Sequence, residues 1–168
     1  MMKKNVLITG ITGQDGSFLT SHLLQNSEYQ IIGTSRNKNN DNFYKKLEHL
    51  NVESSAIKDL KIVQADALDY ESINSVIKKS EIHSVYNLVG PSSVYESVKD
   101  PFNSTKSIIF SFNNLVKALV ENKNYPRFFQ TSSSEMFEAS VNEELNENSA
   151  FNPRSPYASS KLYIHNLI

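Results

Sequence analysis

A tyrosine and a lysine four positions apart, Tyr157 and Lys161, form the pair in this sequence best suited to moving a proton. On a helix, residues at i and i+4 share one face. A nearby ammonium favours the ionised phenol, so such a tyrosine can accept a proton from a substrate hydroxyl while hydride leaves the same carbon. The alternative is a surface pair that arises by chance and has no chemical role.

Hydroxyl groups followed by a carboxylate precede that pair, in residues 131–135, which read Thr-Ser-Ser-Ser-Glu. They end the fifth apolar run of the chain, and ligands of open α/β sheets bind at the carboxyl ends of the strands. Ser133 is placed to orient a substrate oxygen, and Glu135 to remove a proton next to a carbonyl. Alternatively, the serines are ordinary turn residues and Glu135 is an acid in the first turn of a helix.

Three glycines, at positions 10, 13 and 16, follow the first apolar run and open an amphipathic stretch. In such a loop the first glycine allows a tight turn, the second lets backbone approach a pyrophosphate, and the third lets helix and strand pack closely. The positive end of the helix then faces the phosphates. We predict a dinucleotide-binding loop, with a tight turn that binds no ligand as the alternative. Its cofactor-binding residues are Gly10, Thr12, Gly13, Gln14, Asp15 and Gly16.

The residue that follows the second apolar run selects between the two nicotinamide cofactors. An acidic side chain about 20 residues past the last loop glycine would bind the ribose 2′-hydroxyl of NAD. This position holds Arg36, whose guanidinium suits a 2′-phosphate. The sequence therefore favours NADP over NAD, with a solvated surface arginine as the alternative.

The elements that must position these groups alternate between short apolar runs and longer amphipathic stretches, which is typical of an α/β fold. The pattern predicts a Rossmann-like, doubly wound parallel sheet with helices on both faces. The predicted strands cover residues 5–9, 30–35, 60–65, 84–89 and 127–132. The predicted helices cover residues 15–26, 41–50, 70–80, 102–122 and 156–168, and the polar stretch 37–42 predicts a mobile loop.

The composition limits the classes of function. The 168 residues are 39% hydrophobic, carry a formal net charge of −1 and include no cysteine. The charge gives no sign of a nucleic-acid-binding surface, and the lack of cysteine excludes disulfides and cysteine-based metal sites. The apolar run after the first residues is too short for a signal peptide or a membrane span. We expect a cytoplasmic protein with no metal site that binds neither nucleic acid nor membrane.

Taken together, these residues resemble the extended short-chain dehydrogenase/reductase family, also called the NAD-dependent epimerase/dehydratase family, and within it the GDP-mannose 4,6-dehydratases. The segments that carry the likeness include Gly-Ile-Thr-Gly-Gln-Asp-Gly at 10–16, Tyr-Asn-Leu at 86–88, Ser-Glu at 134–135 and Pro-Arg-Ser-Pro-Tyr-Ala at 153–158. The first and the last are rather specific to these dehydratases. The likeness runs along the whole chain, which corresponds to about the N-terminal half of such an enzyme.

The resemblance implies a lyase that converts GDP-mannose to GDP-4-keto-6-deoxymannose, a step of deoxysugar biosynthesis. Tyr157, assisted by Lys161, would deprotonate the sugar 4-hydroxyl while hydride passes from C4 to NADP⁺. Ser133 would hydrogen-bond the 4-oxygen. Glu135 would then remove the C5 proton, water would leave from C6, and the stored hydride would return to C6.

The resemblance also implies further cofactor contacts and a partner. Asp66 and Ala67 match positions beside the adenine, Leu88 falls within the matching fourth strand, and Tyr157 and Lys161 belong to the cofactor site as well. Members of the family form homo-oligomers, and we expect the same here. Where the dehydratases carry a second arginine, this chain has Asn37.

We interpret residues 1–168 as one NAD(P)-binding Rossmann domain that stops before its last strands, with the C-terminal substrate-binding region absent. The alternative is a complete minimal domain. Two other functions stay open. The first is a related nucleotide-sugar epimerase, reductase or dehydratase. Glu135 distinguishes the proposed dehydratase from a simple epimerase or reductase, because these need no carboxylate at that position. The second is a non-catalytic dinucleotide-binding fragment, and we expect the isolated chain to be inactive.

Overall fold

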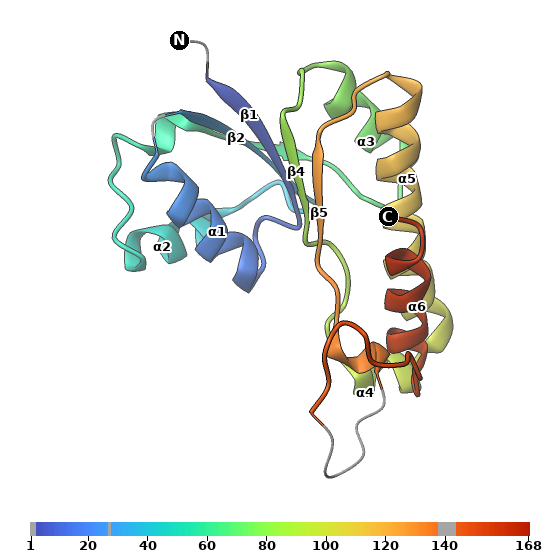
Figure 1. Cartoon of the computed structure of the whole chain (residues 1–168). Coiled ribbons are helices and arrows are strands. Elements are labelled where there is room, and N and C mark those ends of the chain that lie inside the picture. Colours follow the sequence, from blue (N-terminus) through green and yellow to red (C-terminus); the bar gives the residue numbers. More distant parts are fainter. Residues whose placement is uncertain (1–2, 27, 138–143) are drawn as a thin grey trace. The chain divides into compact units, whose positions relative to one another are not determined.

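Five short runs, four with β-branched residues and the fifth with two phenylalanines, form a parallel sheet. The computed structural model describes residues 3–26, 28–137 and 144–168. Its strands are β1 (Lys4–Thr9), β2 (Tyr29–Ser35), β3 (Leu60–Gln64), β4 (Ser84–Asn87) and β5 (Arg127–Gln130). The strand order is β3-β2-β1-β4-β5, and every neighbouring pair is parallel (Figure 1). The predicted Rossmann-like sheet is therefore confirmed.

Helices and single 3₁₀ turns connect the strands. The α-helices are α1 (Gln14–Leu24), α2 (Asp41–His49), α3 (Tyr70–Lys78), α4 (Val94–Lys99), α5 (Pro101–Glu121) and α6 (Pro156–His165). The 3₁₀ turns are η1 (Ile57–Asp59) and η2 (Ser134–Met136). The chain divides into two compact units: unit 1 is Met1–Val89 with Asn113–Thr131, and unit 2 is Gly90–Phe112 with Ser132–Ile168. The description of residues 1–168 as one domain stays a prediction.

In unit 1, both faces of the sheet are covered by helices. On one face Val6, Ile8 and Ile31 pack in a cluster with Leu23 of α1 and Leu47 of α2. On the other face a second cluster joins the sheet to α3 and to the carboxyl-terminal part of α5. The members of that cluster are Leu7, Ile32, Ala65, Ala67, Ile73, Val76, Ile77, Ile82, Val85, Leu115, Ala118 and Leu119. Alternate strand residues point to opposite faces of the sheet, so each face offers apolar side chains for helices to cover. A parallel sheet with helices on both faces is called doubly wound.

Unit 2 contains α4, η2, α6 and the amino-terminal part of α5. The sequence pattern predicts no helix at Val94–Lys99, because six residues are too few to show a helical period. Its start nevertheless has a recognisable signal, since the Ser93 side chain accepts a hydrogen bond from the Glu96 backbone N–H.

Most predicted elements differ from the structure by one to three residues at an end. The largest differences include the last helix, which ends at His165 rather than at residue 168, and β4, which ends at Asn87 rather than at residue 89. Helix α2 begins at Asp41, as the predicted helix 41–50 does, so the polar loop before it ends at residue 40. Ends of elements are the least reliable part of a pattern, since the terminal residues keep the same side-chain types as the element beside them.

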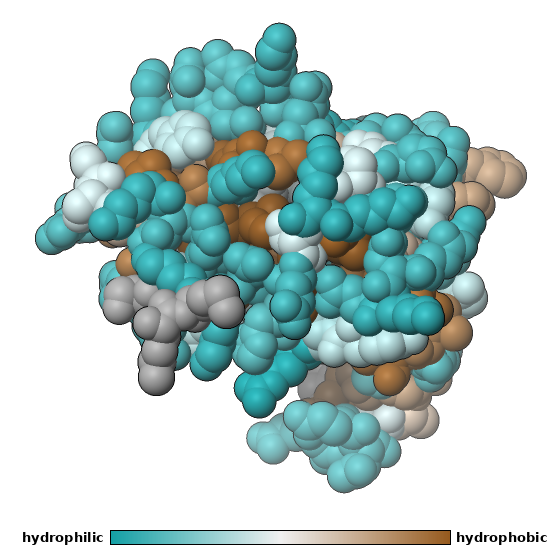
Figure 2. Space-filling view, turned by 90° about the horizontal axis from the view of Figure 1, so that it is seen from above, coloured by the Kyte–Doolittle hydropathy of each residue, from teal (hydrophilic) through white to brown (hydrophobic). Residues whose placement is uncertain are grey.

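Polar and charged side chains cover most of the face shown in Figure 2, and apolar groups lie in the gaps between them. None of the described helices combines the length and the apolar character that crossing a membrane requires.

Candidate functional site

The glycine loop follows β1 and leads into α1, as the sequence predicts. Gly10 has a φ of +69°, and a Cβ there would lie 3.0 Å from the carbonyl oxygen of Leu88. A Cβ at Gly16 would lie 2.3 Å from the carbonyl oxygen of Ile11. Both glycines are therefore required by the shape of the loop. The close packing at Gly16 is with the backbone of the loop itself, next to the end of β1.

Gly13 differs from its two neighbours in the motif. Its φ of −68° suits any residue, and an added Cβ would come no closer than 3.3 Å to the Gly10 carbonyl oxygen. Gly13 is the N-cap of α1 and has no side chain to accept the first N–H groups of the helix. These donors and the positive end of the helix are the features that bind phosphate groups. The loop therefore fits a pyrophosphate.

The other predicted cofactor residues of unit 1 follow the carboxyl ends of the strands. Arg36 comes directly after β2 and is exposed, and its carbonyl oxygen accepts a hydrogen bond from Gln64. Asp66 follows β3, and one of its carboxylate oxygens accepts the Leu68 N–H at 3.0 Å. Leu88 follows β4 and is half-buried. Because parallel strands end at one edge, these positions share the edge that carries the glycine loop.

Ala67, unlike the exposed Arg36, lies in the hydrophobic core. It is buried in the cluster between the sheet and α3 and α5, and its carbonyl oxygen accepts a hydrogen bond from Asn114 of α5 at 3.0 Å. Its predicted contact with an adenine stays a prediction.

Amide side chains link the ends of three strands, a feature that sequence patterns do not reveal. Thr9 of β1 donates to the side-chain oxygen of Asn87 in β4, and Asn87 donates to Gln130 of β5 at 2.6 Å. Asn87 is 1% exposed. From the sequence, Asn87 is recognisable only as part of the Tyr-Asn-Leu segment that carries the family resemblance. These bonds hold the strand ends in register under the loop.

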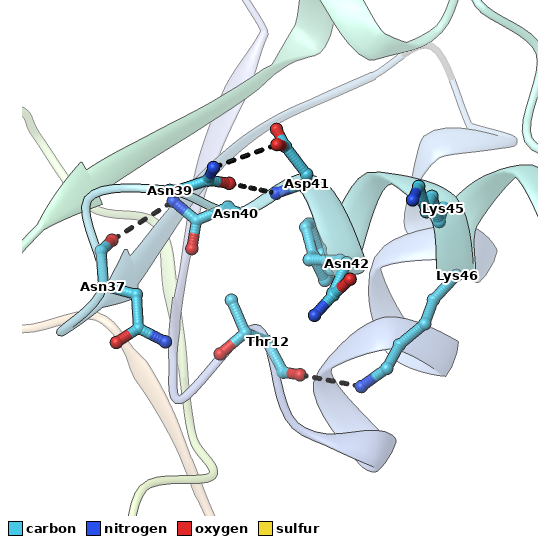
Figure 3. A pocket seen from close by; sticks show the side chains of 9 residues that line it. Thr12, Asn37, Asn39, Asn40, Asp41, Asn42, Lys45 and Lys46 are labelled. Carbon is cyan, nitrogen blue, oxygen red and sulfur yellow. Dashed lines mark hydrogen bonds between the residues drawn. The ribbon is translucent and has the colours of Figure 1, made fainter.

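A second feature that the sequence analysis missed is a hollow beside the glycine loop. Its walls come from the loop, from the segment after β2 and from the first turns of α2 (Figure 3). The sequence signal available was the pair of cations on α2, Lys45 and Lys46, which the sequence analysis does not single out.

In unit 2, α6 positions the predicted tyrosine and lysine. Ser155 caps the helix by accepting the Ala158 N–H at 3.0 Å, and Pro156 occupies its first turn. The backbone N–H of Tyr157 donates to Ser97 of α4, at 3.3 Å. These contacts fix the start of α6 against α4.

Tyr157 and Lys161 lie on one buried face of α6, as the spacing predicts. Their residues are 7% and 6% exposed, and the Lys161 Nζ lies 5.6 Å from the centre of the Tyr157 ring. Burial lowers the pKa of the Lys161 ammonium below its ordinary value, because the charged form loses hydration. The two side chains are therefore neighbours on this face, and their predicted role in proton transfer stays a prediction.

The predicted serine and glutamate lie at η2. Ser133 precedes this turn and is half-buried, and its side-chain oxygen accepts the backbone N–H of Glu135 at 3.2 Å. This is the local turn that the alternative interpretation expects of a serine. The side chain of Glu135 is exposed. In this bond the Ser133 hydroxyl oxygen is the acceptor. The hydroxyl hydrogen can therefore still donate to another oxygen.

The two segments that carry the predicted catalytic residues are tied together within unit 2. Helix α6 packs against η2, and the Asn152 N–H donates to the carbonyl oxygen of Met136 at 2.9 Å. The rings of Phe137 and Phe151 lie 4.8 Å apart, centre to centre. All four predicted catalytic residues therefore belong to one compact unit. Their chemical roles stay predictions.

The comparison with known proteins agrees with this geometry. The family model described as GDP-mannose 4,6 dehydratase matches residues 7–168. The chain belongs to this family. It is 33% identical to GDP-mannose 4,6 dehydratase 1 of Arabidopsis thaliana over 97% of this chain and 46% of that protein. It is 34% identical to the GDP-mannose 4,6 dehydratase of Drosophila melanogaster over 95% of this chain and 41% of that protein. The chain thus spans about half the length of its dehydratase relatives.

Solved structures share the fold of this dehydratase-family chain. The UDP-Glc/GlcNAc 4-epimerase of Campylobacter jejuni has a TM-score of 0.84 at 18% identity, over 98% of this chain and 47% of that one. The UDP-glucose 4-epimerase of Bifidobacterium longum, solved with NAD⁺ and UDP, has a TM-score of 0.82 at 20% identity, over 98% of this chain and 48% of that one. These likenesses show the fold.

Proposed function

We propose that this chain carries the dinucleotide-binding and proton-transfer parts of an NADP-dependent GDP-mannose 4,6-dehydratase. The observation that supports it most is the joint presence of Glu135 with the Tyr157–Lys161 pair in one compact unit of a chain that matches the dehydratase family. Relatives over 95% or more of this chain carry that name. The substrate class is therefore a nucleotide sugar, and GDP-mannose is the first candidate.

Each side chain has a task in this proposal. The Tyr157 phenol removes the proton of the sugar 4-hydroxyl, and the neighbouring Lys161 ammonium stabilises the phenolate. Ser133 donates a hydrogen bond to the 4-oxygen and orients it. Glu135 removes the proton at C5, which the adjacent 4-keto group makes acidic, so that water leaves from C6.

The glycine loop fits the dinucleotide on two counts. Gly13 leaves space for a phosphate where a side chain would project, and α1 offers N–H groups that no side chain caps. When bound, the nicotinamide supplies the hydride acceptor for C4 and the hydride donor for C6. Arg36, exposed after β2, supports NADP over NAD.

A related 4-epimerase is the second candidate, because solved structures with the same fold are nucleotide-sugar 4-epimerases. Glu135 favours the dehydratase. An epimerase oxidises and reduces the same carbon and removes no C5 proton, so it has no need for a carboxylate at this position.

The test joins residues 1–168 to the remaining, carboxyl-terminal part of the Arabidopsis thaliana relative and assays the chimera with GDP-mannose and NADP⁺. We expect a 4-keto-6-deoxy product, and no product from the same chimera with Tyr157→Phe. The chimera with Glu135→Gln should still bind cofactor but should no longer lose the C6 oxygen. A chimera that binds NADP⁺ and epimerises C4 without losing that oxygen would contradict the dehydratase function.

A further inference from the structure

A hollow of about 400 Å³ lies within unit 1, beside the glycine loop. Thr12 lines it from the loop, Asn37 and Asn39 line it from the segment after β2, and Lys45 and Lys46 line it from α2. Figure 3 shows the side chains of Asn37, Thr12 and Lys46 around this space. The volume is in the range of small-molecule sites, which measure roughly 300–1,000 Å³. A group attached to a dinucleotide held at the loop can enter it.

Positive charge exceeds negative charge among the residues that line this hollow. Its cations are Lys45 and Lys46, and the amides of its asparagines can both donate and accept hydrogen bonds. Asp41 is the one carboxylate among the lining residues, and it already accepts the side-chain N–H of Asn39 at 2.9 Å. A pocket that selects an unphosphorylated ribose would present a carboxylate as acceptor. This pocket instead suits an anion.

Lys46 is the cation that connects the hollow to the loop. Its Nζ donates to the carbonyl oxygen of Thr12 at 3.1 Å. An ammonium has three N–H groups, so this bond leaves donors for a ligand. Arg36, the residue that the sequence singles out, is not among the residues that line the hollow. The position of Lys46 therefore makes it the better-placed charge for a group in this space.

We propose that Lys46 is a specificity-determining residue that binds a phosphate monoester on the adenosine ribose of the dinucleotide. This inference rests on the proposed dinucleotide binding at the glycine loop. The Lys46 ammonium contacts the phosphate from α2 and keeps its bond to Thr12, so the phosphate also links α2 to the loop. Asn37 lines the hollow without a charge, and Lys46 supplies positive charge to it from another element.

The test measures binding of two fragments, adenosine 2′,5′-bisphosphate and AMP, to the 168-residue chain by titration calorimetry. They differ only in the ribose phosphate and do not require the nicotinamide or a sugar. We expect the chain to prefer the bisphosphate by about tenfold or more, as charge-assisted hydrogen bonds allow. Lys46→Gln should remove most of this preference and leave AMP binding within about twofold, since the lost contact is to the ribose phosphate.

Two further variants separate charge from shape. Lys46→Arg keeps the charge and should keep the preference. Lys38 lies between β2 and α2 and does not line the hollow. The Lys38→Gln variant should therefore bind both fragments like the parent chain. The preference of the parent should also fall with added salt more steeply than that of Lys46→Gln, because screening weakens the interaction with an exposed charge.

Several results would overturn the proposal. An equal loss of affinity for both fragments in the Lys46→Gln variant would show that Lys46 only positions the loop. A preference that survives Lys46→Gln but is lost in Arg36→Gln would assign the selection to Arg36. Equal affinities of the parent for both fragments would remove the phosphate site and leave dinucleotide binding intact. Binding of neither fragment would contradict both this inference and the dinucleotide function.

Discussion

Gly13 and Gly16 belong to the same loop, but an added methyl group would meet different surroundings at each position. At Gly16 the methyl group would overlap the backbone of Ile11, which cannot move without distorting the turn after β1. At Gly13 it would meet one carbonyl oxygen, that of Gly10, at 3.3 Å. Gly16 is therefore a requirement of the fold, whereas Gly13 is expected to be a requirement of the proposed ligand.

The two alanine variants should behave in opposite ways. Gly16→Ala should lower the free energy of unfolding by about 1–3 kcal/mol, in the range of overpacked sites. Gly13→Ala should unfold close to the parent but bind NADP with about a tenfold loss or more, which is roughly 1.4 kcal/mol. Denaturant unfolding and calorimetry measure the two effects. Normal cofactor affinity in Gly13→Ala would show that no phosphate lies against this residue.

Lys161 should make the free energy of unfolding depend on pH. Because burial lowers its pKa from 10.5 in the folded chain, the unfolded chain binds more protons between the lowered pKa and 10.5. The free energy of unfolding should therefore rise with pH in this window, relative to Lys161→Met, and the difference should be constant below it. Urea unfolding of both chains at several pH values tests the sign. A difference that falls with rising pH would contradict it.

At the scale of elements, α6 depends on its first turn. The Ser155 side chain accepts the Ala158 N–H, and the turn that it caps also carries Tyr157. Loss of the cap would leave a helix N–H without a partner and loosen the attachment of the tyrosine to Ser97 of α4.

Ser155→Ala should lower the free energy of unfolding by about 1 kcal/mol, the usual effect of losing such a cap. Ser159→Ala, an exposed serine one turn later, is the matched control and should change the stability little. Thermal unfolding compares the two. Equal stability of both variants would show that Ser155 does not hold the start of α6.

At the scale of the whole molecule, the sheet of unit 1 has an open edge. Within the described residues β5 pairs with β4 alone, so it is an edge strand of this sheet. Phe129 of β5 is 52% exposed and its ring lies 5.6 Å from that of Tyr86. Exposed edges with apolar side chains promote association of chains.

The purified 168-residue chain should therefore self-associate as its concentration rises, and Phe129→Lys should reduce this association, because a charge at an edge opposes pairing. Phe18→Lys removes an equally exposed phenylalanine from α1, away from the edge, and serves as the control. Sedimentation equilibrium over a range of concentrations measures both. A chain that stays monomeric throughout would contradict the role of the edge.

The sequence by itself determined the sheet, the glycine loop and the shared helix face of Tyr157 and Lys161. Apolar runs and helical periods are local signals, and the i, i+4 spacing fixes a shared face wherever the helix lies. The sequence also determined the family, because its motifs are specific combinations of residue types.

Only the tertiary structure decided which neighbours each of these groups has. The burial of Lys161 and the bond from Lys46 to Thr12 depend on residues that are far apart in sequence. Nothing in the local pattern distinguishes Lys46 from Lys45 or Lys38, since all three are cations in a polar stretch. Packing of α2 beside the glycine loop separates them, because it brings one ammonium within hydrogen-bond distance of the loop.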